Sequence, residues 1–200
     1  MARLILASTS RYRRELLGRL RVPFSVQAPN ADESEHPGEA PAALAERLAA
    51  AKARSIAAPA GAVVIGADQV AALEGRRLRK PGAHAVALRQ LLDAQGKVVT
   101  FHTAATVIDH ASGRSWSHVD RTDVHFATLH EADLDRYLRI EQPYDCAGSF
   151  KSEGLGVALF ERVVCEDPTA LIGLPLIWLA HTLTAAGLDP LCVSSEPSTR

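Results

Sequence analysis

The chain has 200 residues, 47% of them hydrophobic and 22% charged, which is enough apolar material for one compact domain with a full core. With 22 Lys and Arg against 23 Asp and Glu, the formal net charge is −1, so no overall field attracts nucleic acid or an anionic membrane. No repeat or low-complexity tract is visible. We expect a single domain over residues 1–193, followed by a disordered tail over residues 194–200.

Neither a membrane span nor a secretion signal is expected. The longest apolar stretch, residues 171–180, is shorter than a membrane span requires and is interrupted by Gly173 and Pro175. The apolar run at residues 4–7 is too short for the core of a signal peptide, and the three cysteines are odd in number and lack CxxC spacing. We therefore expect a reducing, cytoplasmic location and no membrane or nucleic-acid partner.

Hydrophobic runs and breaker residues predict strands and helices along the chain. The first strand, residues 4–7, breaks into a Ser-Thr-Ser turn and continues as a helix with leucines on its inner face. Further strands are predicted at residues 22–27, 63–67, 98–108, 115–126 and 157–164. Further helices are predicted at residues 42–58, 84–95, 131–140 and 175–186. This order favours an α/β fold around a mixed central sheet, with flanking helices and a ligand cleft at the strand ends.

The turn after the first strand has groups that suit an anion. Ser8 and Ser10 supply hydroxyls beside the backbone N–H groups of a helix N-terminus, which point toward a bound anion. Arg13, one turn later, adds positive charge where a diphosphate or triphosphate would lie. The same residues also fit an ordinary N-cap with surface arginines, and the sequence leaves both interpretations open.

The segment VVIGADQVAALEGRRLRKPG brings an acid and a base close together. The strand at residues 63–67 is predicted to end at Asp68, whose carboxylate can then face a crevice, although such an Asp more often serves as a turn or capping residue. Lys80 follows a turn after that strand, and Pro81 stiffens its backbone, which favours an inward aim. The remaining arginines nearby and in the first helix are expected to be surface charge: Arg14, Arg76, Arg77 and Arg79.

Nine segments together carry a family resemblance. They are LILASTSRYRRELL, the Asp32-Glu33 pair, Lys52 within LAAAKA, IGADQV, GRRLRKPG, VTFHTAA, TDVHF, CAGSFKSEG and DPTALIGLPL. In this order, from about residue 4 to residue 191, the chain resembles the Maf family of nucleoside triphosphate pyrophosphatases. Gln69 after Asp68, and FKSEG at residues 150–154, are similar to the 7-methyl-GTP pyrophosphatase branch, whereas the dTTP/UTP branch tends to have Thr after the Asp. The resemblance implies a Maf/ITPase-like fold with a nucleotide cleft.

The resemblance also implies roles for particular residues. Asp68 matches the family's catalytic base, and Glu33 would be the second carboxylate, with Asp32 a weaker candidate. Together Glu33 and Asp68 would hold a divalent cation, Mg²⁺ or Mn²⁺, as phosphoryl chemistry requires. The residues expected to bind phosphate or offset its charge are Ser8, Ser10, Arg13, Lys52 and Lys80. Taken singly, each lysine also fits a solvated surface position, and Glu33 a solvated loop.

Selection of the base is expected to involve Tyr12, Gln69 and Glu153. A 7-methylguanine ring carries positive charge, which favours an aromatic face and a carboxylate that accepts hydrogen bonds from N1–H and the exocyclic amine. The branch often has Trp at the position of Tyr12, and this departure leaves stacking available but weaker. Tyr12 and Glu153 also fit surface positions, and Lys151 suits either the phosphate site or a pair with a carboxylate.

The implied reaction is hydrolysis of the α–β phosphoanhydride of a noncanonical nucleoside triphosphate, 7-methyl-GTP in this branch, to the nucleoside monophosphate and pyrophosphate. Its biological sense would be nucleotide-pool house-cleaning. Two alternatives stay open: a dTTP/UTP or broad-specificity pyrophosphatase, and a nucleotide-sensing regulator of cell division or septum formation. A homodimer is an open alternative to a monomer.

Overall fold

The computed structural model describes residues 3–192 and has the predicted α/β fold. Its strands are β1 (Arg3–Ala7), β2 (Phe24–Gln27), β3 (Ala62–Leu73), β4 (Arg76–Leu78), β5 (Val98–Asp109), β6 (Ser115–Phe126) and β7 (Phe160–Val164). Its α-helices are α1 (Arg11–Gly18), α2 (Pro41–Arg54), α3 (His84–Ala94), α4 (Glu131–Glu141) and α5 (Leu176–Ala185). Short 3₁₀ helices lie at Ala147–Ser149, Leu155–Leu159 and Ala170–Ile172. The tail predicted at residues 194–200 lies outside the described residues, and the extent of the domain stays a prediction.

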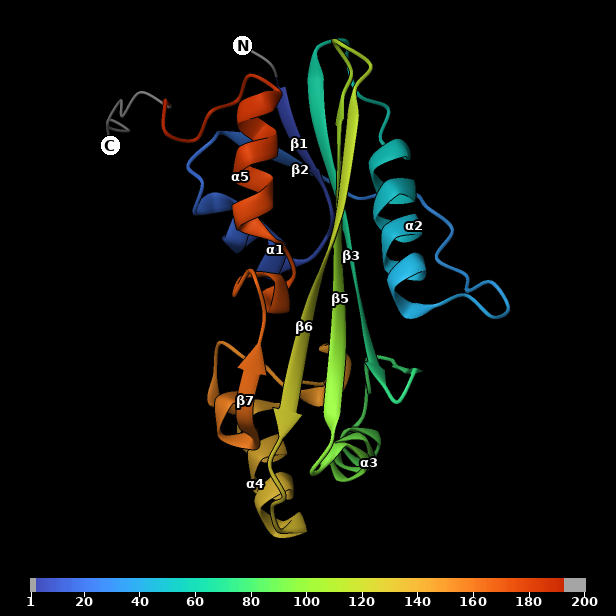
Figure 1. Cartoon of the computed structure of the whole chain (residues 1–200), viewed down its shortest axis with the longest axis vertical. Coiled ribbons are helices and arrows are strands. Elements are labelled where there is room, and N and C mark those ends of the chain that lie inside the picture. Colours follow the sequence, from blue (N-terminus) through green and yellow to red (C-terminus); the bar gives the residue numbers. More distant parts are fainter. Residues whose placement is uncertain (1–2, 193–200) are drawn as a thin grey trace.

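The seven strands form one mixed sheet in the order β2-β1-β3-β5-β6-β7, with β4 paired to β3 off this path. β1 is parallel to β2 and β3, whereas the pairings among β3 to β7 are antiparallel. The long strands β3, β5 and β6 run along the molecule and connect two lobes (Figure 1). We call β1, β2, α1, α2 and α5 the first lobe, and β4, β7, α3 and α4 the second lobe. Among the described residues, no helix combines the length and the hydropathy that crossing a membrane would require.

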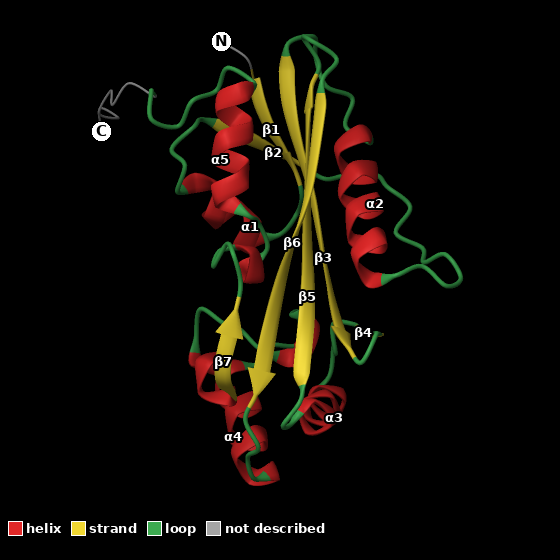
Figure 2. Cartoon of the chain, in the orientation of Figure 1, coloured by secondary structure: helices red, strands yellow, loops and turns green. Residues whose placement is uncertain are grey.

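The first lobe has a hydrophobic core on each face of the sheet. Leu4 and Leu6 of β1 pack with α1 and α5, while the alternate residues Ile5 and Ala7 pack with the end of α2 (Figure 2). Burial on both faces explains why residues 4–7 of β1 are all apolar and do not alternate with polar residues, as is usual for a parallel strand inside a sheet. The loop that leaves the end of β1 is thereby fixed between the two layers.

The second lobe has a separate core that is rich in aromatic rings. Phe150 packs edge to face against Phe101 of β5 and Phe126 of β6, with ring centroids 5.4 and 5.7 Å apart. Leucines of α3 and α4 complete this core. It anchors the segment after α4, which carries the sequence CAGSFKSEG.

Several boundaries differ from the sequence prediction: the helix predicted at residues 42–58 ends at Arg54, and the strand predicted at residues 22–27 begins at Phe24. The strand predicted to end at Asp68 continues to Leu73, because the apolar run after Gln69 keeps pairing with β5. Residues predicted as a surface turn form β4, which closes a tight hairpin through Glu74 and Gly75, both with positive φ. The strand predicted from residue 157 begins only at Phe160, since residues 155–159 form a 3₁₀ helix.

Candidate active site

A cleft opens where one edge of β3 has no neighbouring strand. β1 pairs with β3 as far as Gly66 and β4 pairs from Ala71 onward, so neither of them covers residues 67–70. A cleft of about 740 Å³ lies at this gap between the lobes, within the usual size range of small-molecule sites. Successive side chains of a strand point to opposite faces, yet Asp68 and Gln69 both reach the cleft because it lies at the exposed edge. The prediction of a cleft at strand ends therefore holds for β1, whereas Asp68 lies in mid-strand.

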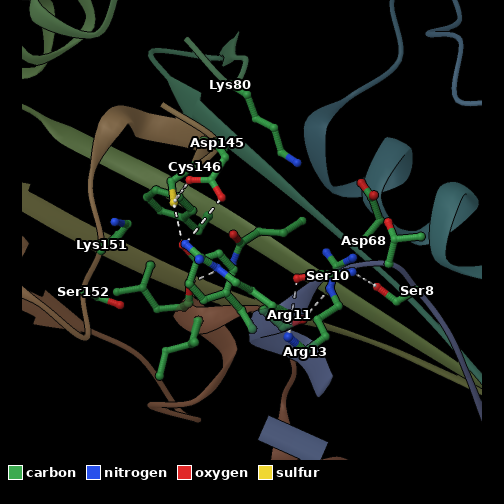
Figure 3. A pocket seen from close by; sticks show the side chains of 18 of the residues that line it. Ser8, Ser10, Arg11, Arg13, Asp68, Lys80, Asp145, Cys146, Lys151 and Ser152 are labelled. Carbon is green, nitrogen blue, oxygen red and sulfur yellow. Dashed lines mark hydrogen bonds and ion pairs between the residues drawn. The ribbon is translucent and has the colours of Figure 1, made fainter. Parts of the chain in front are cut away.

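The Ser-Thr-Ser turn after β1 forms one wall of the cleft. The Ser8 hydroxyl is buried and accepts a hydrogen bond from Ser10 N at 3.1 Å, and the Ser10 hydroxyl accepts one from Arg13 N at 3.4 Å. Ser10 is thus the N-cap of α1 and also lines the cleft, which combines the two interpretations left open by the sequence. Arg13 Nε donates to the Gly173 carbonyl at 3.1 Å, and burial lowers the pKa of its guanidinium from the ordinary value, opposed by Asp68 and Glu33. Figure 3 shows these side chains around the cleft.

Asp68, Lys52 and Glu33 form a charged group at the centre of the cleft. Lys52 Nζ donates to Asp68 Oδ1 at 2.7 Å and lies 3.1 Å from Glu33 Oε1. Lys52 and Asp68 are 6% and 7% exposed, so their ion pair is largely shielded from water, whereas Glu33 is exposed. The second oxygen, Asp68 Oδ2, is buried and has no hydrogen-bond partner within the described residues. An ionised oxygen without a partner is costly unless a ligand, water or cation satisfies it, which makes this atom the functional candidate of the site.

Gly66 allows Lys52 to reach Asp68. A Cβ at Gly66 would overlap the backbone of Ala49 and Ala53, so only glycine permits α2 to pack this closely on β3. Lys52 lies between these alanines on the same helix, and Asp68 is two residues beyond Gly66 on the same face of β3. The buried Lys52–Asp68 pair therefore depends on the close packing of α2 on β3 as well as on the attraction between the two charges.

We expect Lys52→Met to lower the free energy of unfolding by roughly 3 kcal/mol or more, because it leaves Asp68 as a buried charge without its partner. Urea denaturation would measure the loss. Lys97→Met is the matched control: it removes an exposed pair with Glu74, for which about 0–1 kcal/mol is expected. The double variant Lys52→Met/Asp68→Asn should recover part of the loss, and equal losses at Lys52 and Lys97 would contradict a buried, coupled pair.

Three cationic side chains line the second-lobe rim of the cleft. Lys80 extends into the cleft from the segment after β4 (Figure 3). Arg77 and Arg79 line it too, which corrects the prediction that they are only surface charge. The signal in the sequence was their place in the run GRRLRKPG, next to Lys80, which was predicted for the site. Arg14 and Arg76 do lie exposed.

The end of the cleft near α1 has the groups predicted to select the base. The Tyr12 hydroxyl accepts a hydrogen bond from Arg11 at 2.7 Å and lies 3.7 Å from Cys146 Sγ, and burial raises its pKa to about 12. Burial likewise raises the pKa of the Cys146 thiol to about 11, which disfavours a thiolate nucleophile. Arg11 also lies over the Tyr12 ring at 4.7 Å and 3.8 Å from Asp145, which lines the cleft as well. Glu153 lies exposed at this end.

The side-chain nitrogens of Gln69 and Lys151 donate hydrogen bonds to other groups of the protein. The Gln69 amide donates to Thr103 Oγ1 at 2.9 Å and approaches the Ala170 and Leu171 carbonyls at 3.0 Å. Its Oε1 is the atom left to face a ligand. Lys151 Nζ donates to the Glu141 carbonyl at 2.7 Å and pairs with the Glu141 carboxylate at 3.3 Å, which favours the carboxylate-pair interpretation.

All ten residues predicted for the site line this one cleft: Ser8, Ser10, Tyr12, Arg13, Glu33, Lys52, Asp68, Gln69, Lys80 and Glu153. Their individual roles stay predictions. The sequence interpretation missed Arg77, Arg79, Arg11 and Asp145. Arg11 and Asp145 carry no periodic signal, because α1 and the loop after α4 meet only through the tertiary fold.

The fold and the site define an α/β protein with a cleft that combines many cations, a buried carboxylate and an aromatic end, as a nucleotide polyphosphate requires. Residues 3–186 match the model of the family described as Maf-like protein, and the chain belongs to the Maf family.

Proteins of similar sequence include a 7-methyl-GTP pyrophosphatase of Burkholderia pseudomallei, which is 58% identical over 98% of this chain and 93% of its own length. A protein of the same name from Albidiferax ferrireducens is 52% identical over 94% of this chain and 96% of its own. Among solved structures, a nucleoside-triphosphatase (dITP/XTP pyrophosphatase) from Mycobacterium abscessus covers 96% of this chain and 100% of its own, at 15% identity and a TM-score of 0.43. That score is too low to support an inference.

Proposed function

We propose that this protein hydrolyses the α–β phosphoanhydride of 7-methyl-GTP, releasing 7-methyl-GMP and pyrophosphate, in a nucleotide-pool house-cleaning role. Relatives that are 52–58% identical and carry the name 7-methyl-GTP pyrophosphatase support the substrate. The observation that carries the chemistry is the buried, unpartnered Asp68 Oδ2 in a cleft lined by cations. A carboxylate that already binds Lys52 through one oxygen has the other oxygen free either to orient and deprotonate water or to help hold a cation.

The surrounding residues bind and orient the phosphate chain. Ser8, Ser10 and the N-terminus of α1 provide hydroxyl and N–H donors for phosphate oxygens. Arg13, Lys52 and Lys80 offset the negative charge that develops as pyrophosphate leaves the α-phosphorus. A regulator of cell division or septum formation would bind its nucleotide without hydrolysing it. Such binding needs no unpartnered carboxylate at this position.

A divalent cation belongs to the proposal. Within residues 3–192, no three His, Cys, Asp or Glu side chains gather into a metal site made by the protein alone. Asp68 Oδ2 and Glu33 fit Mg²⁺ or Mn²⁺ nevertheless, because Mg²⁺ sites in nucleotide enzymes use one or two carboxylates and complete the shell with phosphates and water. When bound, the cation would neutralise phosphate charge and acidify water. The cytoplasmic location and a homodimer stay predictions.

A substrate panel with pyrophosphate detection tests the proposed function. We expect kcat/KM to be highest for 7-methyl-GTP among 7-methyl-GTP, GTP, dTTP and UTP. A preference for dTTP and UTP would favour the pyrimidine or broad-specificity alternative. Tight binding without pyrophosphate release would favour the regulator.

Glu153→Ala is expected to reduce the preference for 7-methyl-GTP over UTP by roughly 10-fold to 100-fold. Glu153 would accept two hydrogen bonds from the guanine edge, which a uracil ring cannot donate, and a charge-assisted hydrogen bond is worth about 1.5–3 kcal/mol. The ratio of kcat/KM for the two substrates measures the effect. Glu161→Ala, an exposed carboxylate on β7, is the control. An unchanged ratio in the Glu153 variant would remove Glu153 from base selection.

A further inference from the structure

Arg77 and Arg79 share one carboxylate oxygen at the rim of the cleft. Arg77 Nη1 donates to Glu35 Oε1 at 2.5 Å, and Arg79 Nη2 donates to the same oxygen at 2.6 Å. Both arginines line the cleft, and Arg77 also lines a separate, smaller cavity together with Glu35, beside the loop between β2 and α2. Two guanidinium groups converging on one anionic oxygen are an arrangement that also binds phosphate.

These two arginines differ from three other cations of the cleft in how strongly their side chains are held by the protein. Lys52 lies in a buried pair, Arg13 donates to a backbone carbonyl, and Lys151 pairs with Glu141. By contrast, the side chains of Arg77, Arg79 and Glu35 are 27%, 71% and 37% exposed. Exposed ion pairs contribute little net stability, so a multiply charged phosphate chain competes well with one carboxylate for these guanidinium groups.

β4 and the residues that follow it place both arginines beside Lys80. Arg77 lies in β4, Arg79 directly follows its last residue, Leu78, and all three line the cleft. Lys80 follows directly and extends into the cleft (Figure 3). The three cations therefore lie together at one rim of the cleft.

We propose that Arg77 and Arg79 bind the pyrophosphate end of the triphosphate, and that Glu35 holds their guanidinium groups at the rim of the cleft until the substrate displaces it. The inference rests on the proposed function, since it assigns the site of the leaving group. Glu35 is two residues from Glu33, so the exchange removes one of the contacts that hold the loop carrying the second carboxylate, while Arg47 still donates to the Ser34 carbonyl.

Isothermal titration with inorganic pyrophosphate in the presence of Mg²⁺ tests the site. We expect Arg77→Gln/Arg79→Gln to weaken binding about tenfold or more, since two charge-assisted contacts are lost. Glu35→Gln should tighten binding severalfold by removing the competing anion, and should have no effect once both arginines are replaced. Arg76→Gln, on the same strand but outside the cleft lining, should bind pyrophosphate like the wild type. GMP, which lacks the pyrophosphate end, should bind all variants alike.

Several outcomes would overturn the inference. If Glu35→Gln weakens pyrophosphate binding and lowers turnover together, the ion pairs only hold the loop in place. If the arginine variants bind pyrophosphate unchanged, or the wild type does not bind it, the phosphate site is elsewhere. Turnover of 7-methyl-GTP by the wild type, measured in parallel, separates a failure of the proposed function from a failure of the pyrophosphate site. Absence of turnover contradicts the proposed function. Normal turnover together with unchanged pyrophosphate affinity in the arginine variants contradicts only the pyrophosphate site.

Discussion

Asp68→Asn is expected to lower kcat for 7-methyl-GTP by roughly 10² to 10⁴, the range of general-base catalysis. The asparagine amide has the same shape but cannot take a proton from water, and it no longer carries the charge that pairs with Lys52. Because a negative charge is removed from the cleft, nucleotide affinity measured without a divalent cation should be retained or improve. Steady-state pyrophosphate release and binding of a non-hydrolysable analogue would measure the two effects separately.

Asp120 provides the matched control for this variant. It is also a buried aspartate on a central strand, 4% exposed, but it does not line the cleft. Asp120→Asn should therefore keep near-wild-type kcat. Equal losses in both variants would indicate a general structural effect, and unchanged turnover in Asp68→Asn would remove Asp68 as the base.

Removal of divalent cations is expected to lower turnover by about 10³-fold or more, since charge neutralisation on the phosphates accounts for several kcal/mol of the barrier reduction. Activity in EDTA should recover on addition of excess Mg²⁺ or Mn²⁺. Glu33 is one of the two carboxylates proposed to hold the cation. The Glu33→Gln variant should therefore need a higher Mg²⁺ concentration for half-maximal activity.

A circular dichroism spectrum recorded in EDTA is the control for this experiment. It should match that of the untreated protein, because Lys52 already neutralises Asp68 in the fold without a cation. Full turnover in EDTA would exclude the cation from the reaction. Loss of secondary structure on chelation would instead indicate a structural metal.

Much of the fold was predictable because local patterns determine it. The run LILA followed by Ser-Thr-Ser predicted β1 and the start of α1, and the strands predicted at residues 98–108 and 115–126 correspond to β5 and β6. The error at Asp68 has a tertiary cause. A polar pair inside a strand resembles a strand end in sequence, and only the pairing of β3 with β5 along its whole length shows that the strand continues.

In the candidate site, too, the features set by local sequence were predicted and those set by tertiary packing were not. Residues within a motif, such as Ser8 and Lys80, were found by their chemistry and by family resemblance, and the structure brings them into one cleft. The unpartnered oxygen of Asp68 and the convergence of Arg77 and Arg79 on Glu35 depend on how separate segments pack. No spacing rule predicts the contacts of Arg77 and Arg79 with Glu35, because these residues are 42 and 44 positions from Glu35 along the chain.

The central claim is attack of water on the α-phosphorus with pyrophosphate as the leaving group. Hydrolysis of 7-methyl-GTP in ¹⁸O-labelled water, followed by phosphorus NMR and mass spectrometry of the products, tests it most directly. We predict one ¹⁸O atom in 7-methyl-GMP and an equimolar amount of unlabelled pyrophosphate. Orthophosphate with 7-methyl-GDP, or label in the pyrophosphate, would contradict the reaction assigned to this cleft.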